Sequence, residues 1–222
     1  MVCLLKGSIY GLKQSPRQWY KRFDSVVTKA GYTRSRFDTC LYYIDLGTPS
    51  QTFLLIYVDD MLIMGNDLNK ISMVKEALNG EFEMKDMGAA RKILGIDILR
   101  DRRNHKLILS QRHYLQGVLE KFNMSNGKEV NVPLGGHFDL SLKQSPTSED
   151  EKKQMVKVSY AKAIGSLMYL MICTRLDIAY AVSVLSRFMS NPREEQCKGV
   201  KWLLRYLKAT QDYGLVYLKA GY

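Results

Sequence analysis

The first part of the chain has hydrophobic positions at the spacing of a helix. These positions, at i, i+4, i+7 and i+11, are Trp19, Phe23, Val26 and Ala30. They fall on one face and predict a helix that runs to about residue 30. Ser15 is suited to cap its start with Gln18 as the capping-box partner, and Pro16 fits its first position. Gly31 suits the left-handed residue after its end.

A second pattern, at residues 53–65, is typical of two short strands. The run reads Phe-Leu-Leu-Ile-Tyr-Val-Asp-Asp-Met-Leu-Ile-Met-Gly and is interrupted only by Asp59 and Asp60. Because it is apolar on both faces, we expect a β-hairpin with the two aspartates at its tip and helices covering both faces. Asp67 then caps a predicted helix to about residue 79, and Gly80 follows as its stop.

The middle of the chain predicts a second hairpin, with strands at residues 96–99 and 107–109. The basic residues that join these strands are Arg100, Arg102, Arg103, His105 and Lys106. Ser110 is expected to cap the helix that follows. Residues 126–157 are polar and rich in glycine and proline, which indicates a linker.

Beyond the linker the pattern predicts three helices, at residues 160–173, 176–189 and 193–208. Asn191 would cap the third helix and Pro192 would begin it. The basic residues Lys198, Lys201, Arg205 and Lys208 fall close to one face of that helix. They form either a stripe that follows phosphates or an ordinary solvated face. Residues 213–217 have the pattern of a strand with no evident partner within the chain.

Composition and charge favour a nucleic-acid partner. The 222 residues include 33 Lys and Arg against 22 Asp and Glu, which gives a net charge of +11 and an isoelectric point near 9.4. This balance favours polyanions. The four cysteines are far apart and the three histidines do not sit at ligand spacing around them, which argues against a zinc site and for reduced thiols in a cytosolic or nuclear protein. No apolar run is long enough for a transmembrane helix.

The pair Asp59 and Asp60 is the chain's most unusual feature. Hairpin turns of two residues favour glycine after Asn or Asp, so the turn itself does not explain the pair. Two adjacent carboxylates between apolar strands repel each other, and a bound divalent cation would compensate. Oxygen ligands suit Mg²⁺ or Mn²⁺, and two such ions serve phosphoryl transfer. The alternative is a solvated turn without a metal.

Tyr57-Val58-Asp59-Asp60, between two apolar strands, resembles the Tyr-x-Asp-Asp motif of reverse transcriptases. Further segments follow the order and spacing of Ty1/copia-type retrotransposon polyproteins, and the resemblance covers nearly the whole chain. These segments are residues 9–20, 84–88, 94–96, 109–111, 132–134, 165–170 and 204–208.

This resemblance implies an α+β fold, in which a partial right-hand polymerase palm, an antiparallel sheet with packed helices, precedes a helical thumb and connection region. Residues 1–136 would hold the partial palm, the primer-grip hairpin and the first thumb helix. Residues 137–158 would be a linker and residues 159–210 the helical thumb and connection. Residues 211–222 would begin an RNase H domain that the chain lacks.

The resemblance also implies an RNA-directed DNA polymerase that acts on an RNA or DNA primer–template with deoxynucleoside triphosphates. Asp59 and Asp60 would be catalytic residues and ligands of Mg²⁺ or Mn²⁺. The residues that would meet the nucleotide and the template are Gly11, Lys13, Ser15, Pro16 and Tyr57. Those of the primer grip would be Leu94, Gly95 and Ile96. The parent element implies a virus-like particle in the cytoplasm or nucleus, and no membrane partner.

In the family that the chain resembles, a third metal-binding aspartate lies on a strand before the segment at residues 9–20. This chain begins only a few residues before that segment, so we expect little or no polymerase activity from it alone. Leu176 and the pair Gln196-Cys197 depart from the family pattern, which favours a decayed copy. Two alternatives are a non-catalytic nucleic-acid-binding protein, and a remnant that folds poorly because a sheet edge and apolar faces are uncovered.

Overall fold

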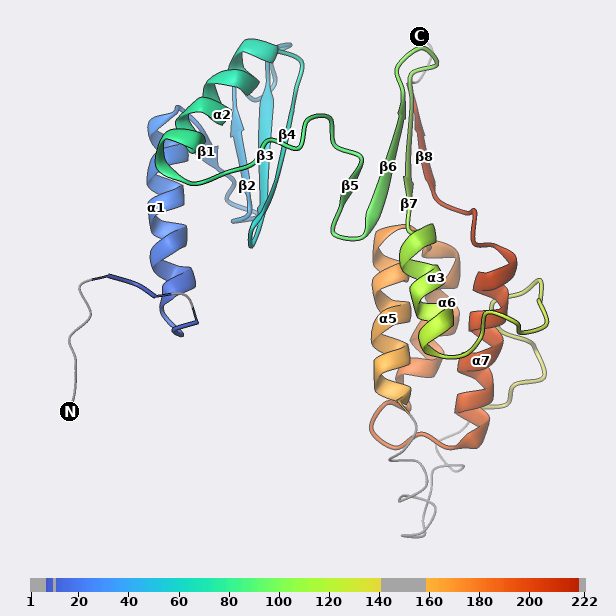
Figure 1. Ribbon diagram of the computed structural model, residues 1–222. Coiled ribbons are helices and arrows are strands. Elements are labelled where there is room, and N and C mark those ends of the chain that lie inside the picture. Colours follow the sequence, from blue (N-terminus) through green and yellow to red (C-terminus); the bar gives the residue numbers. More distant parts are fainter. Residues whose placement is uncertain (1–6, 10, 141–158, 220–222) are drawn as a thin grey trace, which may run out of the picture. The chain divides into compact units, whose positions relative to one another are not determined.

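The structure, a computed structural model, describes residues 7–9, 11–140 and 159–219. The chain divides into two compact units, Met1–Ala90 and Arg91–Tyr222, each with its own antiparallel sheet and its own hydrophobic core (Figure 1). The part of the expected fold class that this architecture confirms is an α+β fold with antiparallel sheets and packed helices.

The first unit is a four-stranded antiparallel sheet with two helices on one side (Figure 1). The strand order is β1-β2-β3-β4. The elements are α1 (Ser15–Lys29), β1 (Thr33–Arg34), β2 (Leu41–Ile44), β3 (Thr52–Tyr57), β4 (Asp60–Gly65) and α2 (Leu68–Glu81).

Helix α1 occupies the predicted range, but it starts differently from the prediction. Its N-cap is Gln14, and the Ser15 hydroxyl donates to the Ile9 carbonyl (2.6 Å) instead of accepting from the first helical turn. The prediction that Ser15 caps the helix was therefore wrong, although Pro16 does lie in the first turn, where its missing N–H costs nothing. Gly31, with φ of 93°, ends the helix as expected.

The core of the first unit lies between α1, α2 and one face of the sheet. Phe23 of α1 packs edge-on against Tyr42 of β2, and Val74 and Leu78 of α2 complete this buried layer. The Tyr42 hydroxyl donates to Asp24 (2.7 Å). Burial, together with hydrogen bonds to Tyr20 and Asp24, holds the pKa of Tyr42 well above its ordinary value.

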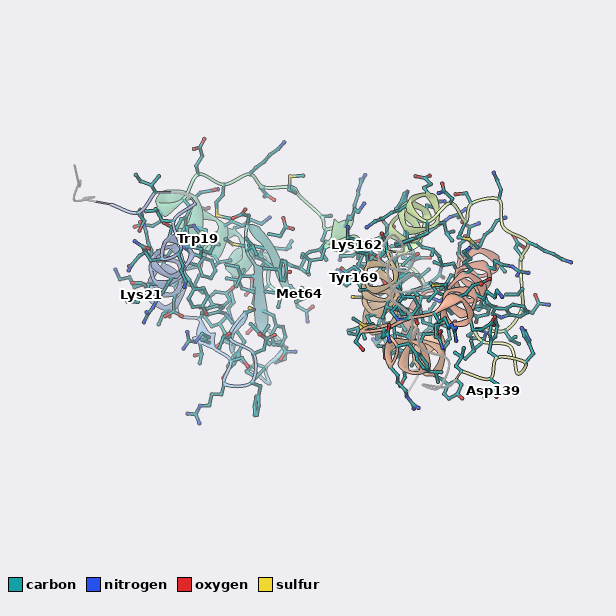
Figure 2. The ribbon with its side chains drawn as sticks, turned by 90° about the horizontal axis from the view of Figure 1, so that it is seen from below. Trp19, Lys21, Met64, Asp139, Lys162 and Tyr169 are labelled. Atoms are coloured by element: carbon teal, nitrogen blue, oxygen red, sulfur yellow. The ribbon has the colours of Figure 1, made fainter. Side chains whose placement is uncertain are left out.

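The opposite face of this sheet is also apolar, but no described residue of the first unit buries it. Its side chains follow from the register of the strands and are Leu41, Tyr43, Phe53, Leu55, Leu62 and Met64. None of them belongs to the buried core, and Met64 is 40% exposed on the side of the sheet away from α1 (Figure 2). The expectation that helices cover both faces was wrong for the first unit, because α1 and α2 lie on the same side and pack against each other. We call this surface the open face.

Helix α2 begins where the sequence predicted. The Asp67 side chain accepts hydrogen bonds from the backbone N–H groups of Asn69 and Lys70, as an N-cap does. The helix continues through Gly80 to Glu81, so the prediction that Gly80 stops it was wrong. Its C-cap is Phe82, whose ring packs against the core of the first unit.

The second unit joins a sheet to a group of helices. Its strands are β5 (Lys92–Ile93), β6 (Ile96–Asp101), β7 (Lys106–Ser110) and β8 (Leu215–Leu218), paired in that order. Its helices are α3 (Arg112–Lys121), α5 (Tyr160–Cys173), α6 (Ala179–Ser186) and α7 (Glu194–Ala209). Ser110 accepts from the N–H of Arg112, although the N-cap position of α3 is Gln111.

Strand β8 pairs with β7, which corrects the expectation that residues 213–217 have no partner within the chain. Val216 lies opposite Ile108, and Tyr217 lies opposite Leu107.

The contacts between residues divide the chain between residues 90 and 91, earlier than the predicted linker at 137–158, because α3 shares a core with α5 and α7. The described part of that linker, residues 137–140, packs on α7, and residues 141–158 lie outside the described residues.

The three helices after the predicted linker appear close to their predicted positions. Helix α5 spans the predicted range, whereas the second is divided into a 3-10 turn at Leu176–Ile178 and α6. Helix α7 begins at Glu194, and the Gln196 side chain accepts from the N–H of Arg193 (2.9 Å). Pro192 therefore lies before the helix and does not begin it, contrary to the prediction.

A buried arginine ties the turn after α5 to the end of α7. The Arg175 side chain is 3% exposed and makes two hydrogen bonds to the Asp177 carboxylate, at 2.9 and 2.7 Å. It also donates to the carbonyl and the hydroxyl of Thr210. Burial raises the pKa of Asp177, but hydrogen bonds from Arg175 and Tyr206 outweigh that effect, and the net pKa is lowered. The arginine thus fixes the turn after α5 against the C-terminal end of α7.

We expect Arg175→Ala to lower the free energy of unfolding by about 3 kcal/mol, because it removes a buried guanidinium and leaves its partners Asp177 and Thr210 without their hydrogen bonds. The matched control is Arg112→Ala, whose ion pair with Asp212 is exposed and should contribute at most about 1 kcal/mol. Chemical denaturation of the two variants measures the difference. Equal losses of stability in the two variants would contradict a stabilising role for the buried network.

Candidate active site

The two aspartates lie at the end of the β3–β4 hairpin, but its turn is displaced from them by one residue. Tyr57 pairs with Asp60, so the two residues of the turn are Val58 and Asp59, and Asp60 is the first residue of β4. The sequence predicted the hairpin and its strands. It did not predict that the turn would be Val58-Asp59, because the pair of aspartates suggested a turn centred on both.

Val58 has a backbone conformation that a β-branched residue rarely adopts. Its φ is 54°, in the left-handed region, and its side chain is 69% exposed, so no burial of its own compensates for the strain. Such conformations persist where the surrounding structure imposes them, and they gather at functional sites. Here the pairing of the two strands on either side of the turn imposes it. The sequence contains no signal for this strain apart from the shortness of the turn.

The register places Tyr57 and Asp60 on the open face of the sheet. They pair across the two strands, and their side chains point to the same side of the sheet as those of the paired Leu55 and Leu62. Tyr57, Asp59 and Asp60 are all exposed. The carboxylates therefore lie at one end of an apolar surface and are accessible to solvent.

Two neighbouring carboxylates supply the oxygen ligands that Mg²⁺ and Mn²⁺ prefer. They are a fitting but incomplete donor set, because no group of three or more His, Cys, Asp or Glu side chains that could hold a metal occurs in the part of the chain that the structure describes. Further ligands would have to come from water, substrate or groups outside the described residues.

The segment before α1 forms a tight turn at the same end of the first unit as the β3–β4 turn (Figure 1). Gly11 has φ of 94°, a conformation that favours glycine, and the N–H of Leu12 donates to the Ile9 carbonyl. The Ser15 hydroxyl, which donates to the same carbonyl, closes this turn. Lys13 is exposed within it. The fold thus brings the segment of Gly11, Lys13, Ser15 and Pro16 to the end of the unit that carries the aspartates.

The predicted primer-grip residues lie in the second unit, in the turn between β5 and β6. Ile93 pairs with Ile96, so Leu94 and Gly95 are the two turn residues, and both have positive φ, at 51° and 77°. This is the geometry of a type I′ turn. Asp97, on the strand after the turn, lies 2.8 Å from Nδ1 of His113 on α3.

The basic turn between β6 and β7 is at the far end of the same strands (Figure 1). Asp101 accepts hydrogen bonds from the N–H groups of Arg103 and Asn104 and from the Asn104 side chain, and these hydrogen bonds lower the pKa of its carboxyl. Arg100, Arg102 and Arg103 are exposed, and none forms an ion pair with a described residue. Their guanidinium groups are available to a polyanion.

The basic residues of α7 are less available than the sequence suggested. Lys198 forms ion pairs with two glutamates of the first turn of its own helix. Arg205 and Lys208 donate hydrogen bonds to the backbone carbonyls of residues 127–128. Arg205 and Lys208 thereby fasten the preceding loop to the helix. Lys201, which is exposed, makes no such contact with a described residue.

None of the helices in the described part of the chain combines the length and the hydrophobicity that a membrane-spanning helix needs.

Comparison with known proteins extends these observations. A sequence model of the family described as "Reverse transcriptase (RNA-dependent DNA polymerase)" matches residues 1–135. The retrovirus-related Pol polyprotein from transposon TNT 1-94 of Nicotiana tabacum is 51% identical over 95% of the chain, and that from transposon RE1 of Arabidopsis thaliana is 38% identical over 99%. The chain covers 16% and 14% of these two proteins.

A shorter relative matches over most of its own length. The transposon Ty5-1 protein of Saccharomyces cerevisiae is 30% identical over 96% of the chain, and the match covers 67% of that protein. No solved structure matches the chain.

The strain at Val58 predicts that a glycine at this position stabilises the protein, although glycine in a strand or helix usually destabilises it. We expect Val58→Gly to raise the free energy of unfolding by about 0.5 to 1 kcal/mol, since the relief of left-handed strain exceeds the entropic cost of glycine. Val216→Gly is the matched control, because Val216 is also exposed but lies in strand β8. It should lower stability by about 1 kcal/mol. Amide hydrogen exchange in the strands of each unit measures both changes, and a loss of stability in Val58→Gly would contradict the account of the turn.

Proposed function

The chain belongs to the reverse transcriptase (RNA-dependent DNA polymerase) family and corresponds to a segment of a copia-type Pol polyprotein, and on that premise we propose that Asp59 and Asp60 are two of the metal-binding carboxylates of a polymerase active site. The observation that carries this proposal is the hairpin, which presents both carboxylates at an exposed tip beside an apolar face. A solvated turn alone would not need an apolar face on that side.

The proposed reaction is nucleotidyl transfer to the 3′ end of a primer. A divalent ion such as Mg²⁺, when bound, would activate the 3′-hydroxyl and stabilise the charge of the leaving pyrophosphate. Asp59 and Asp60 would hold the ion, and their closeness to each other makes the loss of either one costly to binding. The family resemblance implies a third metal-binding aspartate, and no described residue joins Asp59 and Asp60 in that role.

We assign the first unit to the palm, and we assign the turn before α1 to contacts with the nucleotide and the template. In this assignment Gly11 and Lys13 approach phosphate, the turn closed by Ser15 and followed by Pro16 supports them, and Tyr57 lies beside the template on the open face. The β5–β6 turn with Leu94, Gly95 and Ile96 serves as the primer grip, and the helices of the second unit serve as thumb and connection. The partners are a primer–template duplex and deoxynucleoside triphosphates, inside the virus-like particle of the parent element.

The first test of the proposal is primer extension. We expect the purified chain to give little or no extension of a primed RNA template with Mg²⁺ or Mn²⁺, because its described carboxylates do not complete the ligand set. Robust extension that is lost in Asp59→Asn would show that the chain completes the site in another way.

The second test asks whether the hairpin binds metal at all. We expect Mn²⁺ to broaden the amide resonances of residues 57–61 selectively. Asp59→Asn or Asp60→Asn should raise the Mn²⁺ concentration needed for this effect by about tenfold, since each removes one of the two carboxylate ligands. Asp212→Asn is the control, because Asp212 is an exposed aspartate in another turn. Equal broadening in all variants would remove the metal-site assignment.

A second candidate function is nucleic-acid binding without catalysis, and the arginines of the β6–β7 turn favour it. Three exposed guanidinium groups at one hairpin tip suit phosphate contacts, which position a nucleic acid without reading its sequence. Such binding would not need the aspartates.

We expect the chain to bind a primer–template duplex in low salt, with affinity that falls as salt rises. Replacing Arg100, Arg102 and Arg103 with alanine should reduce the slope of log K against log salt by about 0.9 for each phosphate that these arginines neutralise. Asp59→Asn should leave the slope unchanged. If the triple variant binds with the same slope as the parent chain, the tip makes no phosphate contact.

A further inference from the structure

The turn between β5 and β6 is held in place by two tyrosines from different helices. The Tyr169 hydroxyl of α5 donates a hydrogen bond to the carbonyl oxygen of Leu94. The ring of Tyr169 packs edge-on against the ring of Tyr114 on α3, with centroids 5.0 Å apart. A Cβ added to Gly95 would lie 3.9 Å from the Tyr114 ring, which is ordinary van der Waals contact. The turn therefore rests on a platform made by these two rings.

Leu94 makes this support significant. The first residue of a type I′ turn is usually Asn, Asp or Gly, because φ is positive there, yet this turn has a leucine with φ of 51°. A strained residue persists only when its surroundings determine its conformation. The hydrogen bond from Tyr169 is made to the carbonyl of this residue, and it is the described side-chain contact that can hold the peptide group after Leu94 in one orientation.

The support connects the turn to the helical core of the second unit. Tyr169 projects from α5 on the same side as Lys162, two helical turns earlier (Figure 2). Its neighbours Leu167 and Leu170 on α5 are fully buried, so the helix that carries the hydroxyl is fixed by the core. His113, next to Tyr114 on α3, reaches Asp97 on the strand beyond the turn. Both helices thus hold the same hairpin.

We infer that Tyr169 is a positioning residue, which sets the orientation of the Leu94–Gly95 turn and through it the contact of that turn with nucleic acid. This inference rests on the proposed function, because it takes the turn to be the element that meets the primer. In this role Tyr169 needs no phosphate contact of its own. It acts by limiting the conformations of a strained turn, so its hydroxyl matters and its ring alone is not sufficient.

The test replaces the hydroxyl and keeps the ring. Tyr169→Phe retains the contact with Tyr114 but removes the donor to Leu94, and Tyr180→Phe is the matched control on α6, where the side chain is 76% exposed. Amide exchange of Ile96 and Ile98 reports on the hairpin, since the N–H of Ile98 donates to the Arg91 carbonyl at its base. We expect exchange at these amides to be about three to ten times faster in Tyr169→Phe, the range that loss of one hydrogen bond gives.

Duplex binding then separates a positioning role from a structural one. Tyr169→Phe should raise the Kd for a primer–template duplex by a similar factor while the salt dependence keeps its slope, because the variant neutralises the same phosphates. In a Leu94→Gly background, where the turn is no longer strained, Tyr169→Phe should have less effect on both readouts.

Unchanged exchange in Tyr169→Phe would overturn the inference, and so would faster exchange with an unchanged Kd, since the tyrosine would then have only a structural role. Failure of the parent chain to bind the duplex at low salt would overturn the nucleic-acid role proposed for the turn, and with it the inference, while the exchange data would still show whether the tyrosine holds the hairpin.

Discussion

Each unit contains a pair of antiparallel strands joined by a turn of two residues, β3–β4 in the first and β5–β6 in the second, and this constraint fixes the geometry around it. A turn of two residues leaves no freedom of register, so it decides which side chains of each strand face the helices and which do not. In the first unit this register sends Leu54 and Ile56 to the core and places Tyr57 and Asp60 on the open face. A shift of one residue would bury the carboxylate under α1 and α2, where its desolvation would be costly.

The sequence predicted most elements because they follow from local rules. The spacing of Trp19 and Phe23, the cap at Asp67 and the range of α5 all depend on residues close together in the chain. The errors arose where contacts outside the helix or strand itself decide. Ser15 donates to Ile9 rather than capping its helix, Gly80 stays helical in a helix whose Val74 and Leu78 are packed against α1 and the sheet, and β8 finds its partner across most of the second unit. Periodicity contains no information on such contacts.

The candidate site shows the same division. The position of Asp59 and Asp60 on a hairpin followed from the apolar runs on either side of them. The strain at Val58, the open face and the tyrosine that holds Leu94 did not, since each depends on how strands and helices meet. A face that is apolar yet not buried by the unit's own residues is costly in water. Because this face lies beside the carboxylates, the surroundings of the candidate site depend on what covers it.

The pairing of β7 with β8 has a consequence for how the chain folds during synthesis. The strands of the first unit lie close together in sequence, so this unit can fold as soon as it leaves the ribosome. The sheet of the second unit cannot be completed until residue 218 has emerged, because Lys106 pairs with Leu218. Until then the β7 edge is exposed and able to pair with other strands. The nascent chain therefore passes through a stage in which its first half is folded and its second half is open to misassembly.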